Sequence, residues 1–357
     1  MIFAARLCGD SLMLIRMREI DVMRSLAIIL IVFSHLHFFA DLGMYNFPLL
    51  TISSYLSWIG LGIFFFVSGF GLYNKNKEID NLASFYKRRF LRIYPLYWFA
   101  ILVFAFYEFF LGSFPMFTLK SLSPYMLAIT VAGIQGFVPN YPGDLLWFVG
   151  VIIMFYIIYP LLIHPKKTKR LLILYILLFI ILAIIAKLHL VQMNIWNYYL
   201  TFVIGIMANK MLSEHHQIPK QLINMSLVIF ILCSGVYFAV KIFEYINGPV
   251  PSIIIGTLIP LIAVCGSLVI YNNIKKFSVV YNSNIISRIS FCSFAIYLFH
   301  GPILNTFAII LTHYKISTLM ILIALPIVLI ICYYIQKTEV RFVNWLGTLI
   351  EGKDKST

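Results

Sequence analysis

Arg24 and His35 stand eleven residues apart in one apolar segment, residues 20–40, which is long enough to cross a membrane as a helix. Eleven residues make three helical turns with about 20° left over, so both side chains share a face about 16 Å apart along the axis. Ionisable side chains at membrane depth mark functional sites, and an imidazole titrates near neutral pH. We therefore predict a functional site at His35 and Arg24. Two plainer interpretations stay open: Arg24 as a basic anchor at a helix end, and His35 in an interhelical hydrogen bond.

A second group of cations stands at the start of the apolar segment 91–111. Arg88, Arg89 and Arg92 lie close together, and we expect Arg89 and Arg92, one helical turn apart, to share a face. Guanidinium groups bind phosphate through paired, charge-assisted hydrogen bonds. This pattern predicts a phosphate-binding site, unless the cluster only contacts anionic lipid headgroups.

The elements that position these residues are expected to be membrane helices. The 357 residues are 62% hydrophobic and 11% charged, and a water-soluble domain cannot bury that much apolar surface. We predict an all-α polytopic membrane protein with a bundle of about ten transmembrane helices. The expected spans are residues 20–40, 55–73, 91–111, 145–163, 171–188, 195–211, 222–243, 252–271, 289–311 and 316–336.

Lysine and arginine residues set the expected orientation. With the N-terminus in the cytoplasm, the outer segments hold only four of the 27 basic residues, namely Lys120, Lys187, Lys241 and Lys315. Basic loops stay in the cytoplasm, so both termini are expected there. Residues 124–138 would invert this pattern as a further span, so we interpret them as an outer loop or a re-entrant segment. The net charge of +14 then faces membrane lipid and implies no nucleic-acid partner.

The chain is expected to form one domain. Residues 18–339 make up the membrane domain, between a cytoplasmic N-terminal extension, residues 1–17, and a cytoplasmic C-terminal tail, residues 340–357. The N-terminus shows no cleavable signal peptide. The five cysteines are scattered, with neither metal-ligand spacing nor a disulfide pattern, so no metal site is predicted.

Six short motifs, in order along residues 18–339, resemble the membrane-bound acyltransferase-3 family. They are specific in combination rather than singly. The first two are Asp21-x-x-Arg24 followed by His35, and the Phe-rich segment that ends in Ser68-Gly69-Phe70. The remaining four are Arg89-x-x-Arg92, Leu146-Trp147-Phe148 with Tyr156 and Pro160, the segment 293–302 with Tyr297 and His300, and Thr338-Glu339.

The resemblance implies a stand-alone O-acyltransferase, without an appended hydrolase-like domain, in a prokaryotic plasma membrane. Such an enzyme moves an acyl group, with acetyl expected, from cytosolic acyl-CoA to a hydroxyl of an envelope polysaccharide or glycolipid. The arginine cluster would hold the phosphates of acyl-CoA, its co-substrate. The resemblance also implies that His35 and Arg24 are catalytic residues, with His35 acting as a general base or carrying the acyl group covalently. His37 points about 160° away from His35 on a helix and is the weaker candidate. The acceptor and the oligomeric state are not indicated.

Five further residues are candidates for acceptor binding or support: Glu108, Trp147, Tyr297, His300 and Glu339. Glu108 can orient His35, touch a sugar or face water at a helix end. Trp147 can line an acceptor cleft or belong to the interfacial aromatic belt. His300 can line the acceptor path or hydrogen-bond a neighbouring helix, and Glu339 can belong to the site or balance nearby cations.

Two long outer segments, residues 41–54 and 112–144, combine aromatic side chains such as Tyr125 with polar ones such as Gln135. This combination suits contact with a sugar, although such segments can also simply cap a helix bundle.

A different class of function fits the same spans, namely a flippase or exporter of a lipid-linked glycan. A flippase has no use for acyl-CoA, so the arginine cluster and His35 favour the transferase. Release of free thiol from acetyl-CoA would discriminate between the two. Transfer of succinyl or a longer acyl group by the same fold is a second alternative, which the length of the acyl tunnel would decide.

Overall fold

The computed structural model describes residues 17–36, 47–75, 79, 81–112, 122–139, 146–163, 168–314 and 322–354. These residues form α-helices and short 3-10 turns and contain no β-strand, so the predicted all-α fold is confirmed. The elements are α1 (Arg18–His35), α2 (Phe47–Lys75), α3 (Leu82–Leu111), α4 (Pro124–Ala132), η2 (Gln135–Phe137), α5 (Trp147–Ile163), α6 (Thr168–Lys187), α7 (Met193–His215), α8 (Lys220–Asn247), α9 (Ser252–Asn273), η3 (Ile274–Lys276), α10 (Ser278–Tyr281), α11 (Asn284–His313) and α12 (Ala324–Asp354).

The described residues of each of the ten expected spans lie mainly on a helix, and the chain is a multi-pass membrane protein. Five helices are long and apolar enough to cross a membrane by length and composition alone: Thr51–Tyr73 within α2, Leu82–Leu111, Lys220–Asn247, Ile254–Lys276 and Asn284–His313. Two further apolar helices are shorter, Trp147–Ile163 and Leu172–Lys187. α1 begins with acidic residues in its first turn, which lowers its mean hydropathy.

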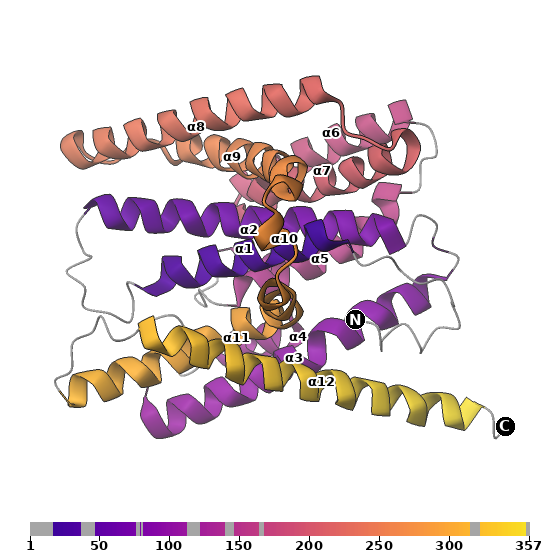
Figure 1. The fold of residues 1–357 in the computed structure, drawn as a ribbon, viewed down its shortest axis with the longest axis vertical. Helices are drawn as coiled ribbons and strands as arrows, with labels where there is room; N and C mark the ends of the chain where they lie inside the picture. Colours follow the sequence, from indigo (N-terminus) through magenta and orange to yellow (C-terminus); the bar gives the residue numbers. More distant parts are fainter. Residues whose placement is uncertain are drawn as a thin grey trace.

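Helix α2 lies at the centre of the bundle. It packs against α1, α7 and α9, and Figure 1 shows α1 and α2 between α8 and α9 on one side and α3, α11 and α12 on the other. A Cβ at Gly69 would overlap the carbonyl oxygen of Phe202 on α7, and a Cβ at Gly205 would overlap that of Phe66 on α2. Such close backbone approach needs small residues at the interface. Gly69 of the Ser-Gly-Phe motif therefore has a packing role.

Residues 124–138 do not form an additional span. α4 is nine residues long, about 14 Å, and it ends at Gly133 in the left-handed conformation with φ of 70°. The η2 turn then packs on α5. The Gln135 side chain is fully buried and donates hydrogen bonds to the Leu146 carbonyl, at 2.6 Å, and to the Tyr97 hydroxyl, at 3.2 Å. The expectation that Gln135 is available to a glycan is therefore wrong, because this side chain holds the segment against α3 and α5.

The start of α1 is fixed to the connection between α9 and α11. Glu19 pairs with Lys275 at 2.7 Å. The Asp21 carboxylate accepts a hydrogen bond from the Ser290 hydroxyl at 2.7 Å. These contacts define what we call the Arg24 end of the bundle, in contrast to the His35 end, where α1 finishes.

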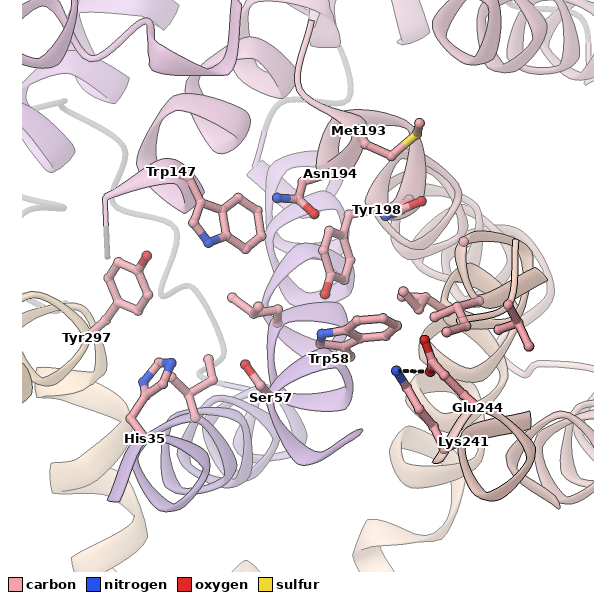
Figure 2. A pocket seen from close by; sticks show the side chains of 17 residues that line it. His35, Ser57, Trp58, Trp147, Met193, Asn194, Tyr198, Lys241, Glu244 and Tyr297 are labelled. Carbon is pink, nitrogen blue, oxygen red and sulfur yellow. Dashed lines mark hydrogen bonds and ion pairs between the residues drawn. The ribbon is translucent and has the colours of Figure 1, made fainter. Parts of the chain in front are cut away.

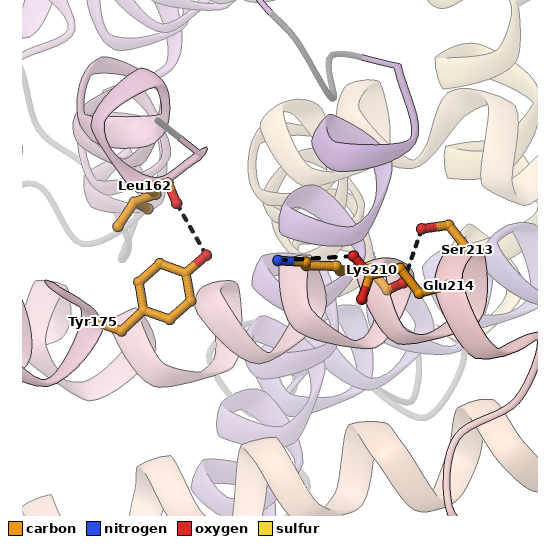
Figure 3. A network of polar contacts seen from close by, with 5 residues as sticks. All are labelled: Leu162, Tyr175, Lys210, Ser213 and Glu214. Atoms are coloured by element: carbon orange, nitrogen blue, oxygen red, sulfur yellow. Dashed lines mark hydrogen bonds and ion pairs between the residues drawn. The ribbon is translucent and has the colours of Figure 1, made fainter. Parts of the chain in front are cut away.

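Polar contacts also tie α5, α6 and α7 together. The Tyr175 hydroxyl of α6 donates to the Leu162 carbonyl of α5 at 3.0 Å, and within α7 Lys210 pairs with Glu214 at 3.9 Å (Figure 3). The Tyr199 hydroxyl of α7 donates in turn to the Tyr175 carbonyl at 3.4 Å. Buried hydroxyls thus find backbone acceptors across these helix contacts.

Helix α12 continues to Asp354 without a break at residue 339. Residues 340–354 of the expected C-terminal tail therefore continue the last helix, and Figure 1 shows α12 reaching beyond its neighbours. Residues 1–16 of the expected N-terminal extension lie outside the described residues.

Candidate active site

A cavity of about 520 Å³ opens at the His35 end of the bundle. A volume of this size lies within the range of ~300–1,000 Å³ that is usual for small-molecule sites. The end of α1, the last turns of α8 and the first turns of α5, α7 and α9 contribute to its wall, and Figure 2 shows its side chains. The polar and aromatic residues of its wall are His35, Ser57, Trp58, Trp147, Asn194, Asn197, Tyr198, Lys241, Glu244 and Tyr297.

His35 contacts His300 across the interface between α1 and α11. The Nδ1 atom of His35 lies 3.0 Å from the Nε2 atom of His300, and the two rings are stacked with 5.2 Å between centroids and 13° between planes. His300 is fully buried, whereas His35 is half-buried and lines the cavity.

The partners of His300 fix the direction of this hydrogen bond. Its Nδ1 atom lies 2.9 Å from the carbonyl oxygens of both Ile296 and Tyr297. A carbonyl oxygen only accepts, so Nδ1 of His300 carries the proton and Nε2 is the acceptor of the neutral ring. His35 must then donate through Nδ1–H. The Nε2 atom of a neutral His35 is consequently the nitrogen that can accept a proton.

Aromatic side chains form one side of the cavity. The Trp147 ring stacks on Tyr198, with 6.0 Å between centroids and 21° between planes. Tyr297, nearly completely buried, lies on α11 one turn before His300. Trp147 therefore contributes to the wall of the cavity. The structure brings Trp147, Tyr297 and His35 together at one site.

Arg24 lies away from the cavity. It is half-buried on α1, and its guanidinium is 3.8 Å from the position that a Cβ of Gly71 on α2 would occupy. Eleven residues of helix separate it from His35, about 16 Å. The structure therefore places Arg24 at the opposite end of the bundle from the cavity, and it does not bring this side chain to the imidazole.

The three arginines at the start of α3 occupy different environments. Arg88 and Arg92 are exposed. Arg89 is only 8% exposed, and its guanidinium lies over the rings of Phe85, at 5.4 Å, and Tyr156, at 5.7 Å. Arg89 and Arg92 stand one turn apart on α3, as expected, but packing of α3 against α5 buries Arg89 and leaves Arg92 exposed. The Nε atom of Arg89 has no hydrogen-bond partner among the described residues.

Glu339 of α12 lies against the same part of α3. Gln336 donates a hydrogen bond to its carboxylate at 2.7 Å. Burial raises the pKa of Glu339 to about 7, while the Gln336 hydrogen bond and the charge of Arg92 act in the lowering direction. Glu339 therefore interacts with the arginine cluster as well as with its own helix. It does not line the His35 cavity.

Glu108 is buried, with 4% exposure. The interpretation of Glu108 as a water-exposed residue at a helix end is wrong, although the side chain does not line the cavity either. Beside it, the Tyr107 hydroxyl accepts a hydrogen bond from Asn305 of α11 at 2.8 Å, which joins α3 to α11. His37 lies outside the described residues. Within the described part of the chain, no three His, Cys, Asp or Glu side chains gather as a metal site would require.

A comparison with known protein families identifies the class of enzyme to which this site belongs. A family model described as an acyltransferase domain, that of the acyltransferase-3 family, matches residues 17–337, nearly the whole chain. The chain belongs to this family. No curated protein and no solved structure matches it. The predicted resemblance is thus confirmed, and the enzyme is an acyltransferase. Its Thr338-Glu339 motif lies just beyond the matched segment.

Several residues of the acyltransferase cavity escaped the sequence prediction. Lys241 and Glu244 are two charges near one end of an otherwise apolar segment, which is a recognised signal of function. Asn194 and Asn197 stand near the start of another apolar segment, where the signal is weaker. Ser57 and Trp58 carry no signal of their own, because single residues of these types are common in membrane helices.

The arrangement suits the acyltransferase to proton transfer at one end and anion binding at the other. At the cavity, the imidazoles of His35 and His300 form a hydrogen-bonded pair, and Nε2 of His35 is the nitrogen that can accept a proton. At the Arg24 end, exposed arginines can pair with phosphates.

Proposed function

We propose that this acyltransferase moves an acyl group, with acetyl expected, from cytosolic acyl-CoA to a hydroxyl of an envelope polysaccharide or glycolipid. The observation that carries the proposal is the hydrogen-bonded pair of His35 and His300 at the wall of a cavity. The cavity volume of about 520 Å³ lies within the usual range of small-molecule sites. That is enough for a sugar ring beside a short acyl group.

In the proposed reaction, Nε2 of His35 takes the proton of the acceptor hydroxyl as its oxygen attacks the thioester carbonyl. A carbon–oxygen bond forms, the carbon–sulfur bond breaks, and the leaving thiolate of coenzyme A takes the proton back from the imidazolium. His300 supports this step because its Nε2 accepts from Nδ1–H of His35, which fixes the tautomer and stabilises the positive charge. The alternative in which His35 carries the acyl group on Nε2 uses the same orientation.

Coenzyme A is proposed to bind at the Arg24 end. Arg88 and Arg92 are exposed there and suit the phosphates of the nucleotide. The buried Nε–H of Arg89 has no hydrogen-bond partner in the described part of the chain and suits a carbonyl oxygen of the narrower thioester arm. Arg24 would stand farther along the route that the thioester arm takes from the arginine cluster towards His35. This assignment requires the Arg24 end to be cytoplasmic, in the plasma membrane, and the cavity to face outwards, as the distribution of basic residues predicts.

The purified protein provides the test, in liposomes with acetyl-CoA on the Arg24 side and envelope glycans on the cavity side. We expect release of free thiol together with acetylated glycan. Single cysteines introduced at positions 170 and 250 and labelled from each side would report the orientation. Glycan movement without thiol release would overturn the proposal in favour of a flippase. Thiol release with no glycan product until a second protein is added would overturn transfer by this chain alone.

A further inference from the structure

We propose that the ion pair of Lys241 and Glu244 selects an uncharged sugar as the acceptor by binding two neighbouring hydroxyls. The inference rests on the proposed function, since it assigns the chemistry of the acceptor bound in the His35 cavity. It gives a role to two charged residues that the proposed transfer step does not use.

The pair lies across the cavity from the reacting histidine. Lys241 and Glu244 stand one turn apart on α8, with 2.8 Å between Nζ and Oε2. Their side chains are 24% and 27% exposed, so both reach the cavity without being fully in water. Figure 2 shows them on the opposite side of the cavity from His35, with Trp58 between. A glycan that fills this space would contact both the pair and His35.

The charges of the pair cancel. Among the described residues that line the cavity, Lys241 and Glu244 are the ones with a permanent charge. A lone cation in a partly buried site would favour an anionic ligand, whereas a cation already paired with a carboxylate does not. The ammonium retains further donors and the carboxylate further acceptor positions. Adjacent donor and acceptor groups match two adjacent hydroxyls, since each hydroxyl both donates and accepts.

Asn197 gives independent support. It is only 6% exposed and lines the cavity, and its Oδ1 atom has no hydrogen-bond partner among the described residues. A buried acceptor left without a partner is destabilising, so a ligand that donates to Oδ1 is favoured. Hydroxyl groups can donate, whereas carboxylate and phosphate oxygens only accept. The indole faces of Trp58 and Trp147 add an apolar surface for the carbon side of a sugar ring.

The test compares neutral and acidic forms of the same sugars. Methyl glycosides of glucose, galactose and mannose and of the three matching uronic acids serve as acceptors for the purified full chain in liposomes. We expect the wild type to prefer the neutral member of at least one pair tenfold or more in kcat/KM. Glu244→Gln leaves Lys241 as an unpaired cation and should shift this preference towards the uronic acid. Lys241→Gln leaves an unpaired carboxylate and should disfavour the uronic acid further.

Two controls separate this inference from its alternatives. The Kd of acetyl-CoA, titrated without acceptor, should be the same in both variants as in the wild type, because the donor is proposed to bind at the Arg24 end, away from the pair. Quenching of tryptophan fluorescence by the glycosides reports binding without transfer. If the protein bound the neutral glycosides more tightly than the uronic acids but released no thiol from acetyl-CoA, the proposed function would be overturned. The inference that the cavity selects an uncharged sugar would still be supported. Equal or better use of uronic acids by the wild type, binding of none of the glycosides, or shifts of the same sign in both variants would overturn the inference.

Discussion

His35 of α1 and His300 of α11 are 265 residues apart in the sequence and share a hydrogen bond of 3.0 Å. Two carbonyl oxygens hold the other nitrogen of His300, so the bond has one direction, from His35 to His300. This relationship gives the two histidines different roles. His35 is the group proposed to touch the acceptor, and His300 is a positioning residue that sets the tautomer of His35.

The roles predict different results for two substitutions of His300. His300→Leu removes the acceptor for Nδ1–H of His35, so we expect kcat to fall on the order of 10²-fold with the KM for acyl-CoA unchanged. His300→Gln can still accept through its amide oxygen and should recover part of the loss. The measurement is the pH profile of kcat for both variants. If His300 had a purely structural role, both variants would instead yield less folded protein. The pH profile of kcat of the folded fraction would then be the same as that of the wild type.

Much of the fold could be predicted from the sequence, because long apolar segments in a membrane can only be helices. The same reasoning found His35, since a histidine inside such a segment stands out. It could not show that His300 is its partner, because contact between α1 and α11 depends on tertiary packing of helices distant in sequence. Hydropathy likewise places Arg89 and Arg92 together, whereas packing of α3 on α5 buries one and exposes the other.

The arginines of α3 should respond differently to the same change. Arg92→Lys keeps the charge but loses the paired donors that suit phosphate, so we expect weaker binding of acyl-CoA, by about tenfold, with unchanged thermal stability. Arg89→Lys loses the stacking on Phe85 and Tyr156 and should lower stability as well as binding. Titration of acyl-CoA and thermal unfolding in detergent measure the two effects. Unchanged affinity in both variants would exclude the cluster from the acyl-CoA site.

The raised pKa of Glu339 predicts that the stability of the folded protein depends on pH. Its ordinary pKa is 4.5, and burial raises the pKa in the folded protein to about 7. The folded state therefore binds more protons than the unfolded state between these values, and stability falls as the pH rises through this window. Glu339→Gln removes the titration, so it should match the wild type near pH 5 and be the more stable protein near pH 8. The measurement is the melting temperature across this range.

Arg92 offers a control for this assignment. Its charge favours the ionised form of Glu339, so Arg92→Gln should raise the pKa of Glu339 further and extend the loss of stability to higher pH. If the pH dependence of melting were the same in wild type, Glu339→Gln and Arg92→Gln, the titrating group would have to lie elsewhere.

Gly69 of the Ser-Gly-Phe motif is predicted to serve packing rather than chemistry. A methyl group at Gly69 would overlap the Phe202 carbonyl, so Gly69→Ala should destabilise the protein by about 1–3 kcal/mol or more. Gly235→Ala is the matched control, because no atom of the described residues lies within 4 Å of a Cβ there. It should be neutral or stabilise α8 by up to about 1 kcal/mol. Equal melting temperatures for the two variants would contradict the close contact of α2 with α7.

The central claim is that Nε2 of His35 performs the chemistry of transfer. The most direct measurement is the initial rate of acetyl transfer from acetyl-CoA to glycan by purified His35→Ala and wild type in liposomes, at equal amounts of inserted protein. Loss of a general base predicts a rate at least about 10²-fold lower than that of the wild type, with acyl-CoA binding retained. A correctly inserted His35→Ala protein that transfers acetyl groups near the wild-type rate would contradict the account.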